Sequence, residues 1–539
     1  MNRRQFLRSA ACTSGVLPVL FTEGCRPQSS TDAHASKNSL PVKPFELEEL
    51  SIVQLQRGMK EGKYTSRGLV ERYLKRIEEI DADGPQLNSV IELNPDALSL
   101  ADQADEGLKR GASRGPLHGI PFLVKDNINT GDRMMTTAGS LALSGHYAAS
   151  DASIVRQLRE AGAVLLGKTN LSEWANFRST RSSSGWSSRG GQTKNPYSLG
   201  RNPCGSSSGS GVAVAASLCA FAIGTETNGS IICPASITGI VGLKPTVGLV
   251  SRSGIIPISE TQDTAGPMTR TVLEAAIVLG AITGADPKDN AMMSRAQSVP
   301  HDYTIFLDVK GLMGKRIGVE KSFLKVHEGV DVLLQQALTQ MTESGATIVE
   351  VDHKERLSAI KDNEYKLLQY EFKDGLNRYL QATDAPVKSL RDVIAYNASH
   401  ASEVMPYFGQ EILEASQARG DLNESAYREA LEKVRSTSRH SIDSLLAEYN
   451  LDALCGPSTG PAWCTDLVNG DAFSGYGMGS GAAMAGYPSI TVPLGDVHGL
   501  PVGLLFVGPA FGEPQLFGIA YAYEQRSQNR RSPVYRQRI

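Results

Sequence analysis

A segment rich in serine and glycine, residues 179–211, lies in the middle of the chain between apolar segments. Its composition alone would suggest a linker. An irregular stretch of this length inside a folded domain is more often functional. It ends in Gly205-Ser-Ser-Ser-Gly-Ser-Gly211 and is followed by an Ala- and Val-rich segment, 212–222, that we predict to be a helix. The fold must therefore be one that encloses a functional loop.

The segments around this loop alternate between two periodicities. Residues 119–125 and 163–166 are short apolar runs typical of buried strands, whereas 45–110 and 152–161 repeat apolar residues at helical spacing. The alternation returns near the C-terminus. It predicts an α/β fold with a single large mixed β-sheet and helices on both of its faces.

The N-terminus resembles an export signal. In residues 1–25, Arg3 and Arg4 precede a short apolar stretch, the pattern of a bacterial twin-arginine signal. The stretch is too short to span a bilayer, so we expect no transmembrane span in the mature protein. Cys25 is a candidate lipoprotein cysteine, although Glu23 disfavours that processing, and lipidation is left open. We expect the twin-arginine export machinery as a partner and a periplasmic or secreted location, with or without a lipid anchor.

The rest of the chain divides into two parts. Residues 26–44 are rich in Ser, Thr, Pro and Asn and predict a flexible leader. Residues 45–539 form the functional domain. Within it, 305–440 are rich in long polar helices whose aromatic residues, such as Tyr365 and Phe372, are expected to line a substrate pocket.

Composition excludes several classes of function. The formal net charge is -3 at pH 7, so no basic field exists to hold nucleic acid. The nine His residues include no His-Glu-x-x-His pair, and we expect neither a metal nor a cofactor. Of the seven Cys, five lie beyond the predicted signal, an odd set without CxxC spacing. This argues against a disulfide framework or a zinc site and predicts free thiols.

Three familiar motifs are rejected on physical grounds. Gly162–Thr169 has phosphate-loop spacing, but its four central residues are apolar and must themselves form a strand. Gly205–Gly209 fits a nucleophile elbow with Ser207 as nucleophile. Such an elbow needs a strand before it, and the two prolines in 195–203 prevent one, so this remains the second choice. Ser322–Lys325 fits a Ser-x-x-Lys motif without its Lys-Thr-Gly companion.

Three elements remain, and together they carry a family resemblance. They are Lys125 at the end of an apolar strand, the run Gly205–Gly211, and the run from Gly224 to Thr246. These runs resemble the amidase signature family of serine hydrolases, over about residues 45–530. Arg201–Ala215 and Gln262–Pro267 are most similar to its bacterial peptide amidases, which remove the amide group from the C-terminus of peptides.

The resemblance implies a role for each site residue. It makes Ser230 the nucleophile, Ser206 the bridging serine joined to Gly205 by a cis peptide bond, and Lys125 the general base. Ser207 would support them by hydrogen bonding rather than react. The expected oxyanion hole consists of the backbone N–H groups of Thr227, Asn228, Gly229 and Ser230.

Elementary chemistry supports the same roles. A serine hydroxyl is a weak nucleophile and needs an adjacent base, and no suitably placed His is evident. A lysine can serve only when neutral, which desolvation favours by lowering its pKa. The apolar residues before Lys125 supply such surroundings. Neutral Lys125 would take a proton from Ser206, Ser206 would take one from Ser230, and the relay would return a proton to the departing nitrogen.

The expected function is hydrolysis of linear amides by an exported enzyme, chiefly deamidation of peptide C-terminal amides with release of ammonia. Hydrolysis of aryl or aliphatic amides is the nearest alternative. A glutamine-dependent transamidation subunit would need a cytosolic partner and tRNA, which the export signal disfavours. A non-catalytic ligand-binding protein on an amidase fold is the alternative from another class. The oligomeric state is left open.

Overall fold

The computed structural model describes residues 39–293 and 299–538. The predicted export signal, Cys25 included, and most of the predicted leader lie outside the described residues. Residues 39–44, the end of that leader, pack on the folded body. Leu40 N–H donates to the Tyr535 carbonyl at 3.1 Å, and Arg76 donates to the Lys43 carbonyl at 3.1 Å. No helix in the described ranges has the length and apolar character needed to cross a membrane.

Eleven strands form one mixed sheet, in the order β1-β3-β2-β6-β8-β7-β12-β13-β11-β9-β10. β2 is parallel to both β3 and β6, and β9 is parallel to β10 and β11, while the other neighbours are antiparallel. This confirms the predicted α/β class with a large mixed sheet. The strands are β1 Val90–Leu93, β2 Pro121–Lys125, β3 Val164–Thr169, β6 Phe221–Glu226, β7 Val241–Lys244, β8 Thr264–Thr269, β9 Arg316–Glu320, β10 Thr347–Val351, β11 Ala453–Pro457, β12 Ser489–Val497 and β13 Leu500–Val507. β4 Trp186–Ser187 and β5 Gly191–Gln192 form a separate hairpin.

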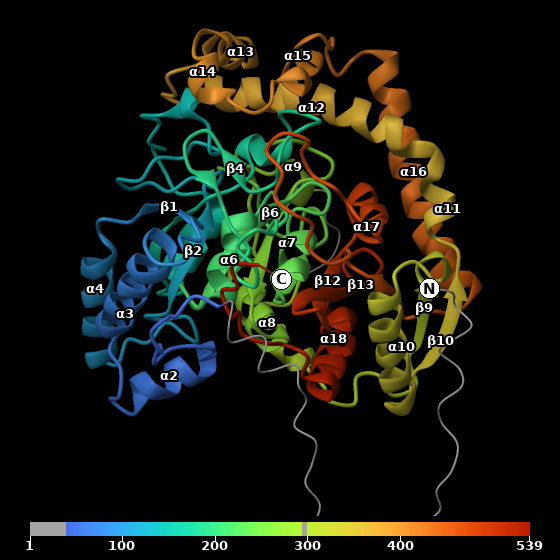
Figure 1. Cartoon of the computed structure of the whole chain (residues 1–539), viewed down its shortest axis with the longest axis horizontal. Helices are drawn as coiled ribbons and strands as arrows, with labels where there is room; N and C mark the ends of the chain where they lie inside the picture. Colours follow the sequence, from blue (N-terminus) through green and yellow to red (C-terminus); the bar gives the residue numbers. More distant parts are fainter. Residues whose placement is uncertain (1–38, 294–298, 539) are drawn as a thin grey trace, which may run out of the picture. The chain divides into compact units, whose positions relative to one another are not determined.

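Helices cover both faces of the sheet (Figure 1). α6 and α7 pack on β6, β7, β12 and β13, whereas α8 and α18 pack on each other and on β8 and β12. The helices are α2 Ile52–Lys60, α3 Ser66–Arg76, α4 Ala97–Lys109, α5 Ser153–Glu160, α6 Ser208–Ala215, α7 Ile232–Ile237, α8 Val272–Ile282, α9 Asn290–Met293, α10 Glu328–Glu343, α11 Lys354–Leu357, α12 Lys361–Gln381, α13 Leu390–Ser399, α14 Ala401–Val404, α15 Glu411–Gln417, α16 Ser425–Glu448, α17 Gly479–Ala485 and α18 Glu513–Ser527.

The central strands are buried along their whole length. Every residue of β2, β3, β6, β8 and β13 is buried. Continuous apolar runs suit such strands because neither face meets water. The run that mimics a phosphate loop is one of them, since its central residues lie in β3 as predicted.

Two segments differ from the prediction. The helix expected over 212–222 is α6, which ends at Ala215, and β6 then begins at Phe221. Small residues made the segment look uniformly helical, but the run Phe221–Ile223 suits a buried strand better, and it pairs with β2. The region 305–440 is also not purely helical, because β9 and β10 join the sheet there.

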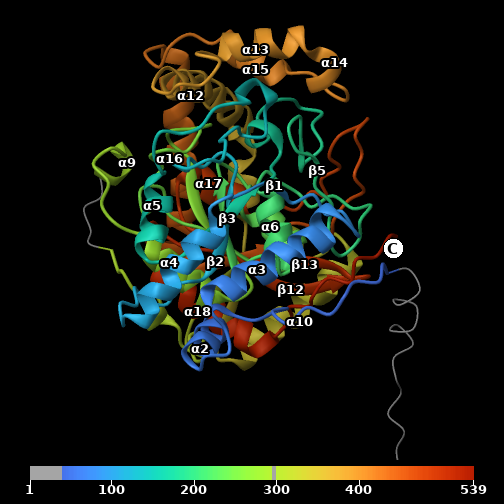
Figure 2. The same ribbon diagram turned by 90° about the vertical axis from the view of Figure 1, so that its left-hand side faces the viewer.

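The helices of the second half of that region cross the sheet at one end. α12 and α16 pack on each other, and Figures 1 and 2 show α12, α13 and α15 above the sheet edge that carries the loops after β2, β3 and β6. Because β2 and β6 are parallel neighbours, Lys125 and Thr225 end at the same edge. The polar loops of the predicted site meet there.

Candidate active site

The amine of Lys125 lies beside the hydroxyl of Ser206. Its Nζ is 2.7 Å from Ser206 Oγ, 2.8 Å from Thr225 Oγ1 and 3.2 Å from the Thr225 carbonyl oxygen. Lys125 and Ser206 are both completely buried. Asn127 holds Thr225 in turn, because its Nδ2 donates to Thr225 Oγ1 at 3.0 Å. The lysine is therefore fixed by strand β6 and aimed at one serine.

Burial lowers the pKa of Lys125 to about 7. The carboxylates of Asp263 and Glu226 act in the opposite direction but only partly offset the desolvation. Burial also lowers the pKa of Lys168 and of Lys244, each to about 8. Neither bonds a serine: Lys168 donates to Ile128 O and Thr136 Oγ1, and Lys244 to Pro245 O. Geometry rather than burial therefore distinguishes Lys125 as a candidate base.

The peptide bond between Gly205 and Ser206 is cis. The Ser206 carbonyl accepts from Ser172 N–H at 3.2 Å. A side chain at Gly205 would lie 2.2 Å from Ser172 Oγ, so only glycine fits against this loop. The segment that carries Ser206 is thereby held against the loop after β3.

Ser230 begins the turn that leads into α7. Its carbonyl accepts from Ser207 N–H at 3.1 Å, which joins the two serine-bearing loops. The Ser207 hydroxyl donates to Thr225 O at 2.9 Å and accepts from Thr225 N–H at 3.2 Å. Ser207 thus ties α6 to β6, whereas Ser230 borders a cavity.

A buried carboxylate that sequence reasoning missed organises this turn. Glu226 Oε1 accepts from Gly229 N–H at 2.8 Å, and Oε2 accepts from the N–H groups of Ile231 at 2.7 Å and Ile232 at 3.0 Å. This corrects one predicted oxyanion donor, because Gly229 N–H is already engaged by Glu226. The N–H groups of Thr227, Asn228 and Ser230 donate to no acceptor within residues 39–293 and 299–538.

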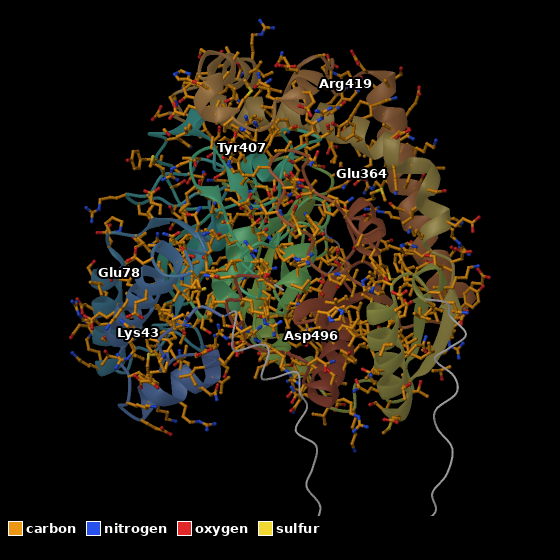
Figure 3. All side chains as sticks on the ribbon, in the orientation of Figure 1. Lys43, Glu78, Glu364, Tyr407, Arg419 and Asp496 are labelled. Carbon is orange, nitrogen blue, oxygen red and sulfur yellow. A yellow bond between two sulfur atoms is a disulfide. The ribbon has the colours of Figure 1, made fainter. Side chains whose placement is uncertain are left out.

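The side chain of Asn228 reaches out to helix α12. Its Nδ2 donates to Glu364 Oε1 at 2.7 Å, and Gln262 Nε2 donates to the same oxygen at 3.0 Å. Figure 3 labels Glu364 on its helix. Burial raises the pKa of the Glu364 carboxyl, and its two amide partners oppose this effect. Sequence alone offered no signal for this link, since α12 lies far from the signature run.

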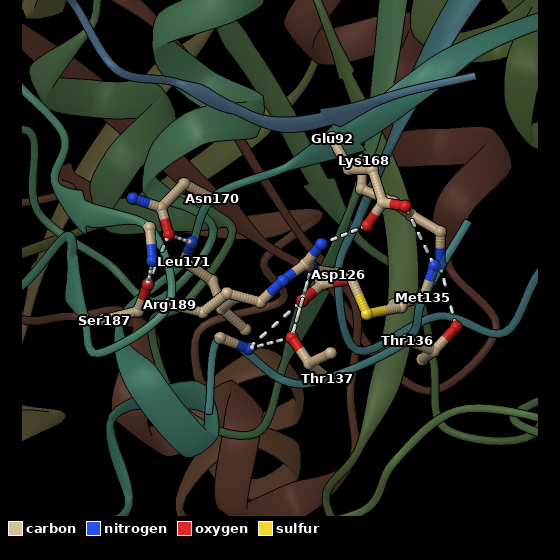
Figure 4. A network of polar contacts seen from close by, with 12 residues as sticks. Glu92, Asp126, Met135, Thr136, Thr137, Lys168, Asn170, Leu171, Ser187 and Arg189 are labelled. Atoms are coloured by element: carbon tan, nitrogen blue, oxygen red, sulfur yellow. Dashed lines mark hydrogen bonds and ion pairs between the residues drawn. The ribbon is translucent and has the colours of Figure 1, made fainter. Parts of the chain in front are cut away.

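The network around Asp126, the residue after Lys125, fixes the end of β2 (Figure 4). Asp126 Oδ2 accepts from the Thr137 hydroxyl and from Gly139 N–H, and it lies 3.4 Å from Arg189, which also pairs with Glu92. Burial raises the pKa of Asp126, and Lys168 and Arg189 act against this rise. Backbone and side chain together prevent the base from shifting along its strand.

A cavity of about 280 Å³ opens over the two serine loops. Its polar floor contains Gly205, Asn228 and Ser230. The remaining walls are largely apolar and come from several loops and from α12; they include Phe177, Ile232, Ile258, Leu368, Phe473 and Tyr476. A second cavity of about 230 Å³ adjoins it through shared lining residues Ala175, Thr227 and Ile258.

The cysteines contradict the prediction of free thiols only. Cys204 and Cys233 form a disulfide, with Cα atoms 6.0 Å apart, and both line the first cavity. Cys219, Cys455 and Cys464 are free. The odd count concealed the pair, because a single disulfide leaves three thiols and needs no short spacing. In the part of the chain that the structure describes, no group of His, Cys, Asp or Glu residues is arranged to hold a metal ion.

Comparisons with known proteins agree with this site. The family model named Amidase matches residues 68–517. A probable amidase of Arabidopsis thaliana is 42% identical, covering 91% of this chain and 92% of the relative. One component of the glutamyl-tRNA(Gln) amidotransferase of Thermoanaerobacter pseudethanolicus is 34% identical, with coverage of 91% and 99%.

Among solved structures, the native peptide amidase of Stenotrophomonas maltophilia superposes with a TM-score of 0.87 at 52% identity. The match covers 91% of this chain and 100% of that one. Likeness of this extent includes the sheet, both serine loops and the helices above them. The chain therefore belongs to the amidase signature family and is an amidase, a hydrolase that acts on carbon–nitrogen bonds.

Proposed function

We propose that this amidase removes the amide group from the C-terminus of peptides, with Ser230 as nucleophile, Ser206 as bridging serine and Lys125 as general base. One observation carries the mechanism: a completely buried amine, its pKa lowered to about 7, lies 2.7 Å from the Ser206 hydroxyl. A neutral amine so placed accepts a proton from Ser206, which accepts one from Ser230 as that oxygen attacks the amide carbon.

The tetrahedral intermediate needs donors for its negative oxygen. Thr227, Asn228 and Ser230 offer N–H groups at the cavity floor. The protonated relay then gives a proton to the departing nitrogen, so that ammonia leaves. Water repeats the cycle on the acyl-enzyme, which returns Ser230 and releases the peptide acid.

Two features support a peptide as the acyl part. The Stenotrophomonas maltophilia protein of 52% identity is a peptide amidase. In this chain the cavity over Ser230 continues into a second one lined by polar and charged residues such as Arg252, Asp263 and Arg378. An acyl group with polar backbone atoms suits such a lining better than a plain fatty chain does.

The test offers the mature protein, without residues 1–25, to peptide amides, fatty amides and anilides and measures the ammonia or amine released. We expect peptide amides to give the largest kcat/KM and Ser230→Ala to abolish the release. Faster release from anilides or fatty amides would contradict the proposed substrate. A protein that turns over no amide and whose Ser230 ignores a fluorophosphonate probe would instead be a binding protein.

We also propose export by the twin-arginine route to the periplasm or beyond. The arginine pair Arg3-Arg4 supports it, and so does the Cys204–Cys233 disulfide, because such bonds persist in oxidising compartments. Changing both arginines to lysine should leave the protein in the cytoplasm, as judged by cell fractionation. A matched variant with lysine at Arg8 should still be exported, and export of the double variant would contradict the route.

A further inference from the structure

We infer that the Cys204–Cys233 disulfide is a positioning element of the active site, which sets the loop of Ser206 against the loop of Ser230, and that full activity requires its oxidised form. The inference rests on the proposed roles of these two serines. Cys204 lies two residues before Ser206, and Cys233 lies three residues after Ser230. The bond therefore joins the two loops close to both reacting hydroxyls.

Each serine loop is anchored to a different part of the fold. The loop of Ser206 is held by Ser172 N–H, which donates to the Ser206 carbonyl, and by the tight contact of Gly205 with Ser172. The loop of Ser230 is held by Glu226 at the end of β6. The distance between the two hydroxyls therefore depends on what joins the loops to each other.

One direct hydrogen bond joins them, from Ser207 N–H to the Ser230 carbonyl at 3.1 Å. The disulfide adds a covalent link at the opposite ends of the same two segments. Local contacts secure both cysteines: Cys204 N–H donates to Asn202 Oδ1 at 2.8 Å, and Cys233 N–H donates to the Gly229 carbonyl at 2.8 Å. A displacement of either loop would thus be transmitted to the other.

Proton transfer between two hydroxyls demands hydrogen-bond distance. An error of about 1 Å in the placement of reacting groups can cost roughly 100-fold in rate. Loss of the covalent link should therefore slow the chemical step. Binding should change little, because the walls that receive the substrate, such as Leu368 and Phe473, belong to other segments.

The chemistry of the switch is a thiol–disulfide exchange. A dithiol transfers two electrons and two protons to Cys204 and Cys233; the S–S bond breaks, two thiols form, and the dithiol becomes its own disulfide. The pair lines the active-site cavity, so a small reductant can reach it. A chain exported in the folded state with both thiols reduced would gain full activity only in an oxidising compartment.

The experiment reduces the folded, mature enzyme with a dithiol and counts the cleaved bonds by alkylation and mass spectrometry. We expect kcat on a peptide amide to fall about 10- to 100-fold with less than about a 3-fold change in KM. The rate of fluorophosphonate labelling at Ser230 should fall in parallel, and reoxidation should restore both. Cys464→Ser, which removes the exposed free thiol, should behave as the wild type in every arm.

A second variant separates the bond from other effects of the reductant. Cys204→Ser/Cys233→Ser should show the reduced values from the start and should not respond to dithiol. An unchanged kcat and labelling rate after verified cleavage of the bond in folded enzyme would overturn the inference. Lack of turnover by the oxidised enzyme would contradict the proposed substrate instead, while the labelling rate would still report on the positions of the serines.

Discussion

Lys125 Nζ lies 2.7 Å from Ser206 Oγ, and both side chains are completely buried. No carboxylate bonds this amine among the residues that the structure describes; its other two contacts are with Thr225. A substantial fraction of such an amine is neutral near pH 7, as its pKa of about 7 indicates. The strand that ends at Lys125 thus delivers a base where the family signature delivers a hydroxyl.

The first prediction concerns the three proposed catalytic side chains. Lys125→Ala and Ser230→Ala should each lower kcat/KM by about 10³- to 10⁶-fold, because groups that act as one relay fail together. Ser206→Ala should also be severe. Steady-state release of ammonia from a peptide amide provides the measurement.

Ser207→Ala is the matched control for these variants. Its hydroxyl bonds Thr225 on β6 rather than lining the cavity, so activity should fall by less than about 10-fold, in keeping with the loss of ordinary hydrogen bonds. A dead Ser207→Ala variant beside an active Ser230→Ala variant would show that the nucleophile-elbow interpretation was correct after all.

The pH dependence follows from the lowered pKa of Lys125. The neutral amine is the active form, so activity is low below the folded pKa of about 7 and rises as pH passes through it. We expect kcat/KM for an uncharged peptide amide to rise about tenfold per pH unit on the acid side and to level off in mildly alkaline solution. A rate that is flat across this range would exclude a titrating lysine.

The same lysine should cost the fold stability. Between about 7 and the ordinary lysine pKa of 10.5, the unfolded chain holds a proton on Lys125 that the folded chain does not. Unfolding takes up a proton there, so this group makes stability rise with pH, by up to about 1.4 kcal/mol per unit. The penalty is greatest below pH 7 and vanishes above 10.5.

Lys125→Met should therefore raise the free energy of unfolding by a few kcal/mol at pH 6–7 and by little near pH 10. Chemical denaturation at both pH values would measure this gain. Lys43→Met, at a side chain 78% exposed, should change stability by less than about 0.5 kcal/mol at either pH. A Lys125→Met protein that is less stable than the wild type at pH 6 would contradict the cost assigned to the buried amine.

A further prediction concerns the turn held by Glu226. Its carboxylate accepts three backbone N–H groups of the turn that carries Ser230. Glu226→Gln replaces one acceptor oxygen by a donor, so the turn should shift and misalign the oxyanion donors. We expect kcat to fall by about 10²-fold with a smaller change in KM.

Glu364→Gln serves as the comparison for that variant. It keeps an oxygen for the Asn228 and Gln262 amides, so its effect on kcat should be smaller than that of Glu226→Gln. Stopped-flow labelling by a fluorophosphonate measures both without a choice of substrate. Equal labelling rates for Glu226→Gln and the wild type would exclude a role for Glu226 in placing the nucleophile and its oxyanion donors.

Much of the fold was predictable from local pattern. Buried strands such as β2 and β3 are continuous apolar runs bounded by polar residues, and this pattern predicted them. β9 and β10 escaped because they are short strands between long polar helices, and β10 is largely exposed or half-buried. Their pairing is tertiary information that periodicity does not contain.

The site was predicted in its residues but not in its supports. The signature runs contain Ser206 and Ser230, and Lys125 ends the preceding apolar strand. The partners of these residues come from distant segments: Glu364 from α12 and Arg189 from the Ser- and Gly-rich loop. Cys204 and Cys233, 29 residues apart, become neighbours only when the two loops fold together.

Activation of Ser230 by a neutral Lys125, acting through Ser206, is the central claim. The most direct measurement is the rate of fluorophosphonate labelling of the mature enzyme as a function of pH, with the adduct located by peptide mapping. We predict a single adduct on Ser230, formed faster as pH rises through about 7 and lost in Lys125→Ala. An adduct on Ser207, or labelling that survives in Lys125→Ala, would contradict the claim.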